Sequence, residues 1–167
     1  MKKYELTEET FTVFGKTLYR IRAVRDFGSV KTGEFGGYIE KEENLSHFGD
    51  AWVYGNAKVY GDAKVYGDAK VYGDARVSGN AWVYGNAEVF NTRHFFVQGP
   101  IGSRDGYVTF YRTKDDTVEV RCGCFSGSLQ EFVNQVEETH GGSRYEKEYK
   151  LAAELAKVCI RLEGESR

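Results

Sequence analysis

A six-residue unit recurs without a slip along the middle of this chain. It begins as Val53-Tyr-Gly-Asn-Ala-Lys58 and continues as Val-Tyr-Gly-Asp-Ala-Lys twice, Val-Tyr-Gly-Asp-Ala-Arg, Val-Ser-Gly-Asn-Ala-Trp and Val-Tyr-Gly-Asn-Ala-Glu, ending at Phe90. One degraded unit, His47-Phe-Gly-Asp-Ala-Trp52, precedes the run. Internal repetition at a fixed period is typical of architectures that stack one structural unit many times.

A period of six excludes an α-helix for this segment. Helical apolar spacing is near 3.6 residues, and each glycine inside a helix costs about 1 kcal/mol. A strand fits better, because in Ala-Lys-Val-Tyr the Ala and Val side chains face one way and Lys faces the other. The Gly-Asp or Gly-Asn pair supplies a corner, since these residues tolerate positive φ or hydrogen-bond their own backbone. The repeat therefore predicts four-residue strands joined by two-residue corners.

From about His47 to Phe90 this pattern resembles the hexapeptide-repeat left-handed β-helix, with Val and Ala in the inward positions. In that family three hexapeptides form one triangular coil of about 18 residues, and coils stack at the sheet spacing of about 4.8 Å. This register stacks Tyr54 on Tyr72 and Phe90, Tyr60 on Ser78, and Tyr66 on Tyr84. A second outward line aligns Trp52 with Lys70 and Glu88, Lys58 with Arg76, and Lys64 with Trp82.

A wider resemblance covers roughly residues 20–93. The stretches Gly33-Glu-Phe-Gly-Gly-Tyr-Ile-Glu40 and Asn44-Leu-Ser46, followed by Gly49-Asp-Ala-Trp-Val-Tyr-Gly-Asn-Ala57, resemble hexapeptide-repeat proteins encoded by bacteriophages and prophages. Members of that family are mostly of unknown role. The resemblance implies a viral protein that acts in the cytoplasm of a bacterial host.

The edges of the repeat divide the chain into three segments. Residues 1–44 hold two strands around Gly15-Lys16 and irregular first coils, which we expect to form an N-terminal β cap. Residues 45–93 are the β-helix, and residues 94–167 a small α+β domain of ββαα order. Its strands are expected over 106–113 and 118–124, and capping boxes at Ser128 and Ser143 open its two helices. The predicted fold class is mainly β: a left-handed parallel β-helix with an N-terminal β cap and a small C-terminal domain.

Composition excludes several classes of function. The 167 residues include 23 basic and 25 acidic ones, so the charge excess of a nucleic-acid binder is missing. No run of 18 apolar residues exists, and no apolar segment follows the first residues, so neither a membrane span nor a secretory signal is predicted. Three cysteines cannot all pair, which fits a reducing compartment.

No catalytic residue, metal site or cofactor is predicted. Many hexapeptide β-helices are acyltransferases with a histidine base between neighbouring subunits, whereas His47 and His94 here lie at the two ends of the repeat. Cys122-Gly-Cys124 invites a metal or nucleophile interpretation, and the favoured one is two small residues on a buried strand face. Asp62, Asp68 and Asp74 are interpreted as turn residues.

A phosphate-bearing ligand is one functional hypothesis. The turn Pro100-Ile-Gly-Ser-Arg-Asp-Gly106 presents a serine and an arginine, and Phe125-Ser-Gly-Ser128 enters a helix whose first N–H groups are donors. Two further features support a phosphate-bearing ligand: an arginine on the polar face of its strand, and tyrosines able to stack on a base. An ordinary turn and an ordinary helix cap explain the same loop residues. The candidate ligand-binding residues are Ser103, Arg104, Tyr107, Arg121 and Ser128, with Tyr111 as a further stacking residue.

Outward aromatic residues give a second hypothesis, because such residues anchor protein interfaces, although stacked tyrosines also stabilise a coil. The candidate partner-binding residues are Trp52, Trp82, Tyr66 and Tyr84. Flat faces of this kind also favour a homo-oligomer, a trimer or a dimer. The leading hypothesis is a non-enzymatic phage-type protein that engages a host protein, as an inhibitor of a bacterial defence system. The alternatives are a sponge for a phosphate-containing nucleotide signal and a hexapeptide-repeat acyltransferase.

Overall fold

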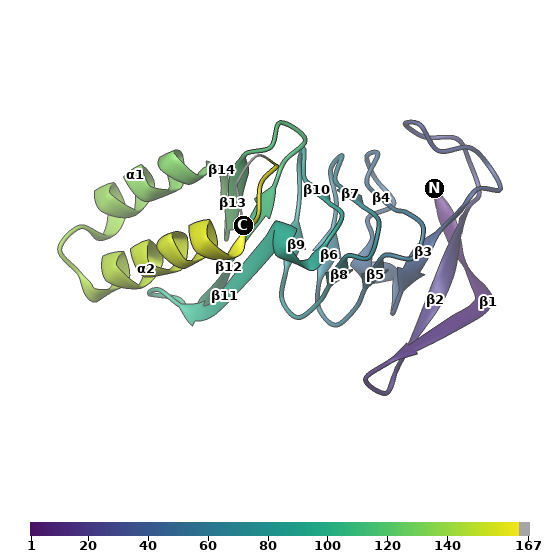
Figure 1. Cartoon of the computed structure of the whole chain (residues 1–167), viewed down its shortest axis with the longest axis horizontal. Helices are drawn as coiled ribbons and strands as arrows, with labels where there is room; N and C mark the ends of the chain where they lie inside the picture. The colour runs from purple at the N-terminus through teal and green to yellow at the C-terminus, as the bar shows by residue number, and fades with distance from the viewer. Residues whose placement is uncertain (164–167) are drawn as a thin grey trace. The chain divides into compact units, whose positions relative to one another are not determined.

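The computed structural model describes residues 1–163, and these form a mixed α and β chain (Figure 1). Strands account for 40% of them and helices for 21%. The chain folds as two compact units: unit 1 is Met1–Thr92, and unit 2 begins at Arg93. The last residues of the predicted C-terminal domain, 164–167, lie outside the described residues.

Each repeat contributes one short strand, and the strands pair in parallel. Trp52 pairs with Lys70 and Lys70 with Glu88, so partners are 18 residues apart and the register expected from the sequence is confirmed. The three ladders are β4–β7–β10, β5–β8 and β6–β9. The strands are β4 (Trp52–Val53), β5 (Lys58–Val59), β6 (Lys64–Val65), β7 (Lys70–Val71), β8 (Arg76–Val77), β9 (Trp82–Val83) and β10 (Glu88–Val89).

These strands are two residues long, so the expectation of four-residue strands is wrong. Hydrogen bonds still flank each pair, since Trp52 N donates to Ala69 O and Tyr54 N donates to Val71 O. The chain then leaves the ladder at a glycine of positive φ, as at Gly73 (66°), where a Cβ would lie 2.6 Å from the carbonyl oxygen of Phe90. The inward alanines and valines are buried as predicted, namely Ala51, Val53, Ala57, Val59, Ala63, Val65, Ala69, Val71, Ala75, Val77, Ala81, Val83, Ala87 and Val89.

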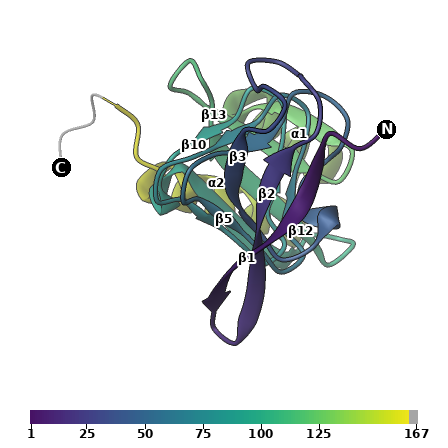
Figure 2. The same ribbon diagram turned by 90° about the vertical axis from the view of Figure 1, so that its right-hand side faces the viewer.

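An N-terminal hairpin continues one ladder into a larger sheet. Strands β1 (Tyr4–Val13) and β2 (Lys16–Ala23) are antiparallel, β3 (Phe35–Ile39) pairs antiparallel with β2 and parallel with β5, and the sheet order is β1-β2-β3-β5-β8. Figure 2 looks along the stacked turns of the repeat and shows the hairpin extending past them. The two strands expected around Gly15-Lys16 are confirmed, and the first of them is longer than expected.

The residues just before and inside β1 bind carbonyl groups of the first turn of the repeat. Lys3 Nζ donates to Ala51 O at 2.6 Å and to Gly49 O at 3.2 Å, while Tyr4 Oη donates to Leu45 O at 2.7 Å. Both side chains are fully buried, and burial lowers the pKa of Lys3 to about 8. The N-terminal segment therefore supplies donors to carbonyl oxygens at the start of the repeat.

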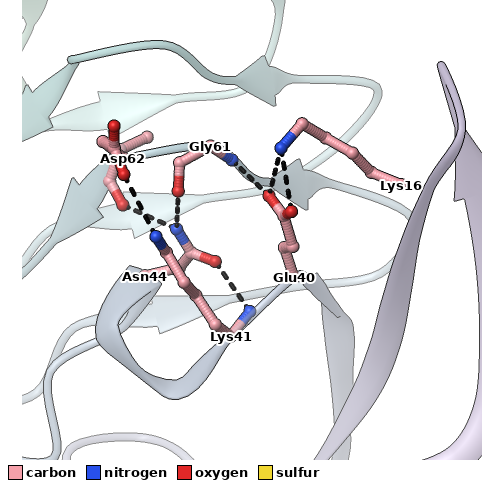
Figure 3. A network of polar contacts seen from close by, with 7 residues as sticks. Lys16, Glu40, Lys41, Asn44, Gly61 and Asp62 are labelled. Carbon is pink, nitrogen blue, oxygen red and sulfur yellow. Dashed lines mark hydrogen bonds and ion pairs between the residues drawn. The ribbon is translucent and has the colours of Figure 1, made fainter.

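Asn44, at the end of the 3₁₀ turn η1 (Glu42–Asn44), ties this turn to the repeat (Figure 3). Its Nδ2 donates to Gly61 O at 3.1 Å and to Ala63 O at 2.8 Å, and its Oδ1 accepts from Lys41 N at 2.9 Å. Beside it, a Glu40 carboxylate oxygen accepts from Gly61 N at 2.6 Å. The fully buried Asn44 side chain thus satisfies three backbone groups at once.

Unit 2 is an antiparallel sheet packed against two helices. Sheet order is β11 (Phe95–Ile101), β12 (Gly106–Arg112), β13 (Val118–Cys122) and β14 (Phe125–Ser128), followed by α1 (Leu129–His140) and α2 (Arg144–Cys159). The sequence predicted only two strands, so the ββαα order is incomplete. The apolar core between sheet and helices consists of Val108, Phe110, Val120, Phe132, Val136, Ala152, Ala153, Ala156 and Ile160.

The two helix starts differ in their caps. Ser128 Oγ accepts from Glu131 N at 3.1 Å and Ser128 N donates to Glu131 Oε2 at 2.7 Å, which confirms the first capping box. At α2, Ser143 Oγ accepts from Glu146 N at 3.4 Å, but the Glu146 carboxylate accepts from Gly142 N instead of Ser143 N. The second capping box is therefore only half formed.

We expect Asn44→Ala to lower the free energy of unfolding of unit 1 by about 2–3 kcal/mol, because buried backbone groups lose their partners. Both tryptophans of the chain, Trp52 and Trp82, lie in unit 1, so denaturation followed by tryptophan fluorescence measures this quantity. Asn86→Ala, at an exposed corner of the repeat, is the matched control and should shift the midpoint little. Equal shifts for the two variants would contradict the role given to Asn44.

Candidate functional site

Three aromatic side chains on the β6–β9 ladder form one patch, which we call the aromatic flank: Tyr66, Trp82 and Tyr84. The Tyr66 ring centroid lies 4.7 Å from that of Tyr84 and 6.3 Å from that of Trp82, the latter at an interplanar angle of 84°. Lys64 Nζ lies 5.4 Å from the Trp82 ring centroid. Trp82 is 36% exposed and the two tyrosines are half-buried. The ladder backbone thus presents large amphipathic rings on a rigid support.

Trp52 does not belong to this exposed surface. It is fully buried, with the Tyr4 ring 6.0 Å away and the Phe27 ring 5.2 Å away, both edge-on. Its predicted alignment with Lys70 and Glu88 is correct. However, the N-terminal segment folds over this position, so the expectation that Trp52 offers contact surface is wrong.

The residues expected to bind phosphate divide between two ends of the sheet in unit 2. Ser103 and Arg104 lie exposed in the β11–β12 turn, beside the Ile101–Gly106 pair. Ser128 pairs with Glu119, which in turn pairs with Tyr111, five residues along β12 from Gly106. At about 3.4 Å per residue this separates Ser128 from the turn by about 17 Å. The expected site therefore does not assemble around the N-terminus of α1.

Tyr107 lies at the same end of the sheet as the β11–β12 turn, and Arg121 pairs with Thr109, midway along β12. Both alternate with core residues of their strands, so they lie on the sheet face opposite the helices. Tyr107 is 42% exposed and its ring packs on Gly99. Tyr111 is fully buried, so the expectation that it stacks on a base is wrong.

The same end of the sheet carries a cluster that we call the thiol edge: Arg104, Cys122, Cys124 and Tyr149. Tyr149 lies beside the Cys122 thiol, and burial raises the pKa of both groups. Nearby, Gly102 N donates to Glu148 Oε2 at 2.7 Å. Cys122 is half-buried, whereas Cys124 is exposed in the β13–β14 turn. The expectation that both cysteines lie on a buried strand face is wrong, because the strand ends at Cys122.

Sequence reasoning missed an open groove on the β4–β7–β10 ladder. Its lining residues are Tyr54, Lys70, Tyr72 and Glu88, and its volume is about 350 Å³. The Tyr54 and Tyr72 rings meet at 90° with centroids 6.2 Å apart, and Tyr72 Oη donates to Glu88 Oε2 at 3.3 Å. The period of the repeat predicts that all four residues lie on adjacent outward rows. It does not predict the orientation of the tyrosine rings, on which the shape of the groove depends.

The two histidines that flank the repeat are both packed against other side chains. The His47 ring stacks on Tyr4 at 4.2 Å, and its Nδ1 accepts from Lys3 N at 3.3 Å. His94 is buried, and this burial, reinforced by the charge of Arg112, lowers its pKa to about 4. Both histidine rings therefore contribute to side-chain packing where they lie.

Two features of residues 1–163 bear on metal binding and on membrane insertion. No group of three or more His, Cys, Asp or Glu side chains in this range is placed to hold a metal ion. None of its helices is both long enough and apolar enough to cross a membrane. No protein-family model matches the chain, and no curated protein matches it significantly.

Burial of His94 predicts a pH dependence of the stability of unit 2. Its folded pKa of about 4 lies below the ordinary value of 6.5, so the unfolded chain takes up a proton first as the pH falls. The free energy of unfolding should decrease by up to about 3 kcal/mol between these two pH values. His94→Gln should remove this part of the slope when unfolding is followed by helical circular dichroism. An unchanged slope in the variant would contradict the prediction.

Proposed function

We propose that the protein is a non-enzymatic binding protein of bacteriophage or prophage type, whose aromatic flank engages a bacterial host protein. The observation that carries this proposal is the patch formed by Tyr66, Trp82 and Tyr84 on one ladder of the repeat. Aromatic side chains held on a rigid backbone lose little conformational entropy on binding, and they dominate the energetics of protein interfaces.

The proposed scaffold for this flank is a left-handed parallel β-helix with an N-terminal β cap. Three lines of support are the 18-residue offset of paired strands, the inward alanines and valines, and the glycines of positive φ at the corners. The sequence resemblance to phage hexapeptide-repeat proteins, which implies the handedness, is the fourth. Stacked coils of this kind hold outward residues in straight lines, which suits a surface that must fit one partner.

A protein partner suits the charge of the chain better than a nucleic acid does. Lys64 lies over the Trp82 ring of the flank, and the whole chain has nearly equal numbers of acidic and basic residues. A protein that acts through such a contact works by occupying its partner's surface. We therefore propose an inhibitor that blocks a component of a bacterial defence system in the host cytoplasm, as a trimer or dimer that presents several copies of the flank.

Trp82→Ser should abolish stable co-purification of the host protein from a bacterial lysate. Binding of the same protein, once identified and purified, should be weakened at least tenfold in calorimetry, as expected for loss of an interface anchor. Tyr54→Ser, which alters an outward tyrosine on another ladder, is the matched control and should bind like the parent chain. Loss of binding in both variants, or in neither, would overturn the role of the aromatic flank.

A second candidate function is capture of a phosphate-bearing nucleotide at the β11–β12 turn. The observation in its favour is that Arg104 and Tyr107 lie at one end of the sheet, and that Arg121 lies on the same sheet face as Tyr107. If the protein is a sponge, heating the complex purified from infected or expressing cells should release an intact nucleotide, and Arg104→Ala should abolish its capture. Unaffected capture in the variant would exclude this site.

The third alternative, acyl transfer, has a direct test of its own. The non-enzymatic proposal expects no thiol to be released when the protein is incubated with acyl-coenzyme A and amino sugars. Release above the level of a heat-denatured sample would contradict it.

A further inference from the structure

Two thiols lie at the tip of one tight hairpin in unit 2. Strands β13 and β14 pair through Cys122 and Phe125, which leaves Gly123-Cys124 as a two-residue turn. Of these two residues only Gly123 has a positive φ, 57°, which matches a type II′ hairpin turn with glycine in its first central position. The glycine thus fixes the bend, and it places one cysteine at the end of a strand and the other inside the turn.

The two cysteines differ in access to solvent. Cys124 is exposed, whereas Cys122 is half-buried on the face that packs against the helices. They are nevertheless close enough for the charge of one to influence the other, since ionised Cys124 adds to the effect of burial in raising the pKa of Cys122. This is the arrangement of an accessible attacking thiol with a protected second thiol beside it.

The surroundings of this pair are polar and carry arginine side chains. The Tyr149 phenol lies beside the Cys122 thiol, and its position leaves no room for a Cβ at Gly102 in the neighbouring turn. Arg104 acts electrostatically on Tyr149, and Arg121 acts on Cys122. Glu148 lies at the same edge, where it accepts the Gly102 N–H and pairs with Arg144 at 3.5 Å. The charge of Arg121 favours the Cys122 thiolate, whereas burial is the larger effect and raises the pKa of this thiol.

We propose that Cys122 and Cys124 form a redox-active dithiol that exchanges with small, negatively charged disulfides. This activity is independent of the aromatic flank, which lies in unit 1. In oxidised glutathione each half carries carboxylates, which the two arginines attract. It is therefore the disulfide of choice for the test.

The exchange proceeds in two balanced steps. Cys124, deprotonated, attacks one sulfur of the glutathione disulfide; the disulfide bond breaks, one glutathione leaves as a thiolate that takes up a proton, and a mixed disulfide forms on Cys124. Cys122, deprotonated in turn, attacks the Cys124 sulfur and releases the second glutathione. Two protein thiols are oxidised to one Cys122–Cys124 disulfide, and one glutathione disulfide is reduced to two thiols.

The resulting disulfide would be easily reversed. Two consecutive Cα spacings of about 3.8 Å bent at a turn place the cysteine Cα atoms within about 7 Å, near the upper limit that a disulfide spans. A strained or exposed disulfide has an oxidising potential and is readily reduced. The pair therefore suits a switch or a disulfide donor better than a structural crosslink.

Tyr149 is a positioning residue for the second step. Its hydroxyl lies beside Cys122 and favours the thiolate, in opposition to burial. In Tyr149→Phe we expect unchanged formation of the mixed disulfide on Cys124 and slower release of the second glutathione. A variant that merely loosened the packing would alter both steps.

The experiment places the full chain in buffers of graded ratios of reduced to oxidised glutathione. Thiols are trapped by alkylation and the products are mapped by mass spectrometry. The expected product is a Cys122–Cys124 disulfide that disappears when reduced glutathione is added. Cys159→Ser, at the end of α2, is the matched control and should behave like the parent chain. Cys122→Ser should stall as a mixed disulfide on Cys124, and Cys124→Ser should react much more slowly.

The role proposed for the arginine charge in attracting a negatively charged disulfide is tested by a separate measurement. Arg104→Ala should slow the reaction with oxidised glutathione severalfold at low salt and leave the reaction with neutral hydroxyethyl disulfide unchanged. Cysteines 122 and 124 that remain reduced at every ratio, or a product that joins either of them to Cys159, would overturn the proposal. Equal slowing with both disulfides would overturn the role of the arginine. None of these outcomes depends on host-protein binding, so this proposal and the proposed function can fail separately.

Discussion

The backbone hydrogen bonds of the repeat run from one turn of the chain to the next, and every turn depends on a neighbour for them. Tyr54 N donates to Val71 O, and Tyr72 N donates to Val89 O, one turn further on. Local propensity gives little support, because each strand is only two residues long. Stability therefore comes from stacking, from the buried columns of alanine and valine, and from whatever satisfies the first turn. Lys3, Tyr4 and Asn44 do this at the N-terminal start of the repeat by donating to its carbonyl groups.

Much of unit 1 follows from the period of the sequence, because the same spacing sets both hydrogen bonding and side-chain direction. The contacts of Tyr66 with Tyr84, and of Lys64 with Trp82, were predicted from the period together with the three-hexapeptide coil that the family resemblance implies. Burial of Trp52 was not, because the segment that covers it comes from more than 20 residues upstream and carries no repeat. The period of a repeat predicts how each repeat packs on the next one, but it does not predict where a non-repeating segment packs.

In unit 2, the start of the first helix was predicted correctly from the local sequence, but its position relative to the β11–β12 turn was not. The start of α1 at Ser128 follows from its capping box. The additional strand β14 runs back along β13, however, and carries that helix start to the opposite end of the sheet from Ser103 and Arg104. Strand β11 escaped prediction because Gly99-Pro100 interrupts its alternation, and both residues are uncommon inside strands. The thiol edge likewise depends on the two-residue turn Gly123-Cys124, which separates two cysteines that the sequence analysis had placed on one strand.

The 18-residue offset between paired strands also determines which changes in the length of the repeat preserve the alignment of its side chains. Removing or inserting 18 residues would return every outward residue to its own line, and the N-terminal segment would meet the same kind of turn as before. A change of six residues would instead shift each downstream strand to the next of the three ladders and separate Trp82 from Tyr66. Natural variation in the length of this repeat should therefore occur in steps of whole turns, with the aromatic flank as the feature that such steps preserve.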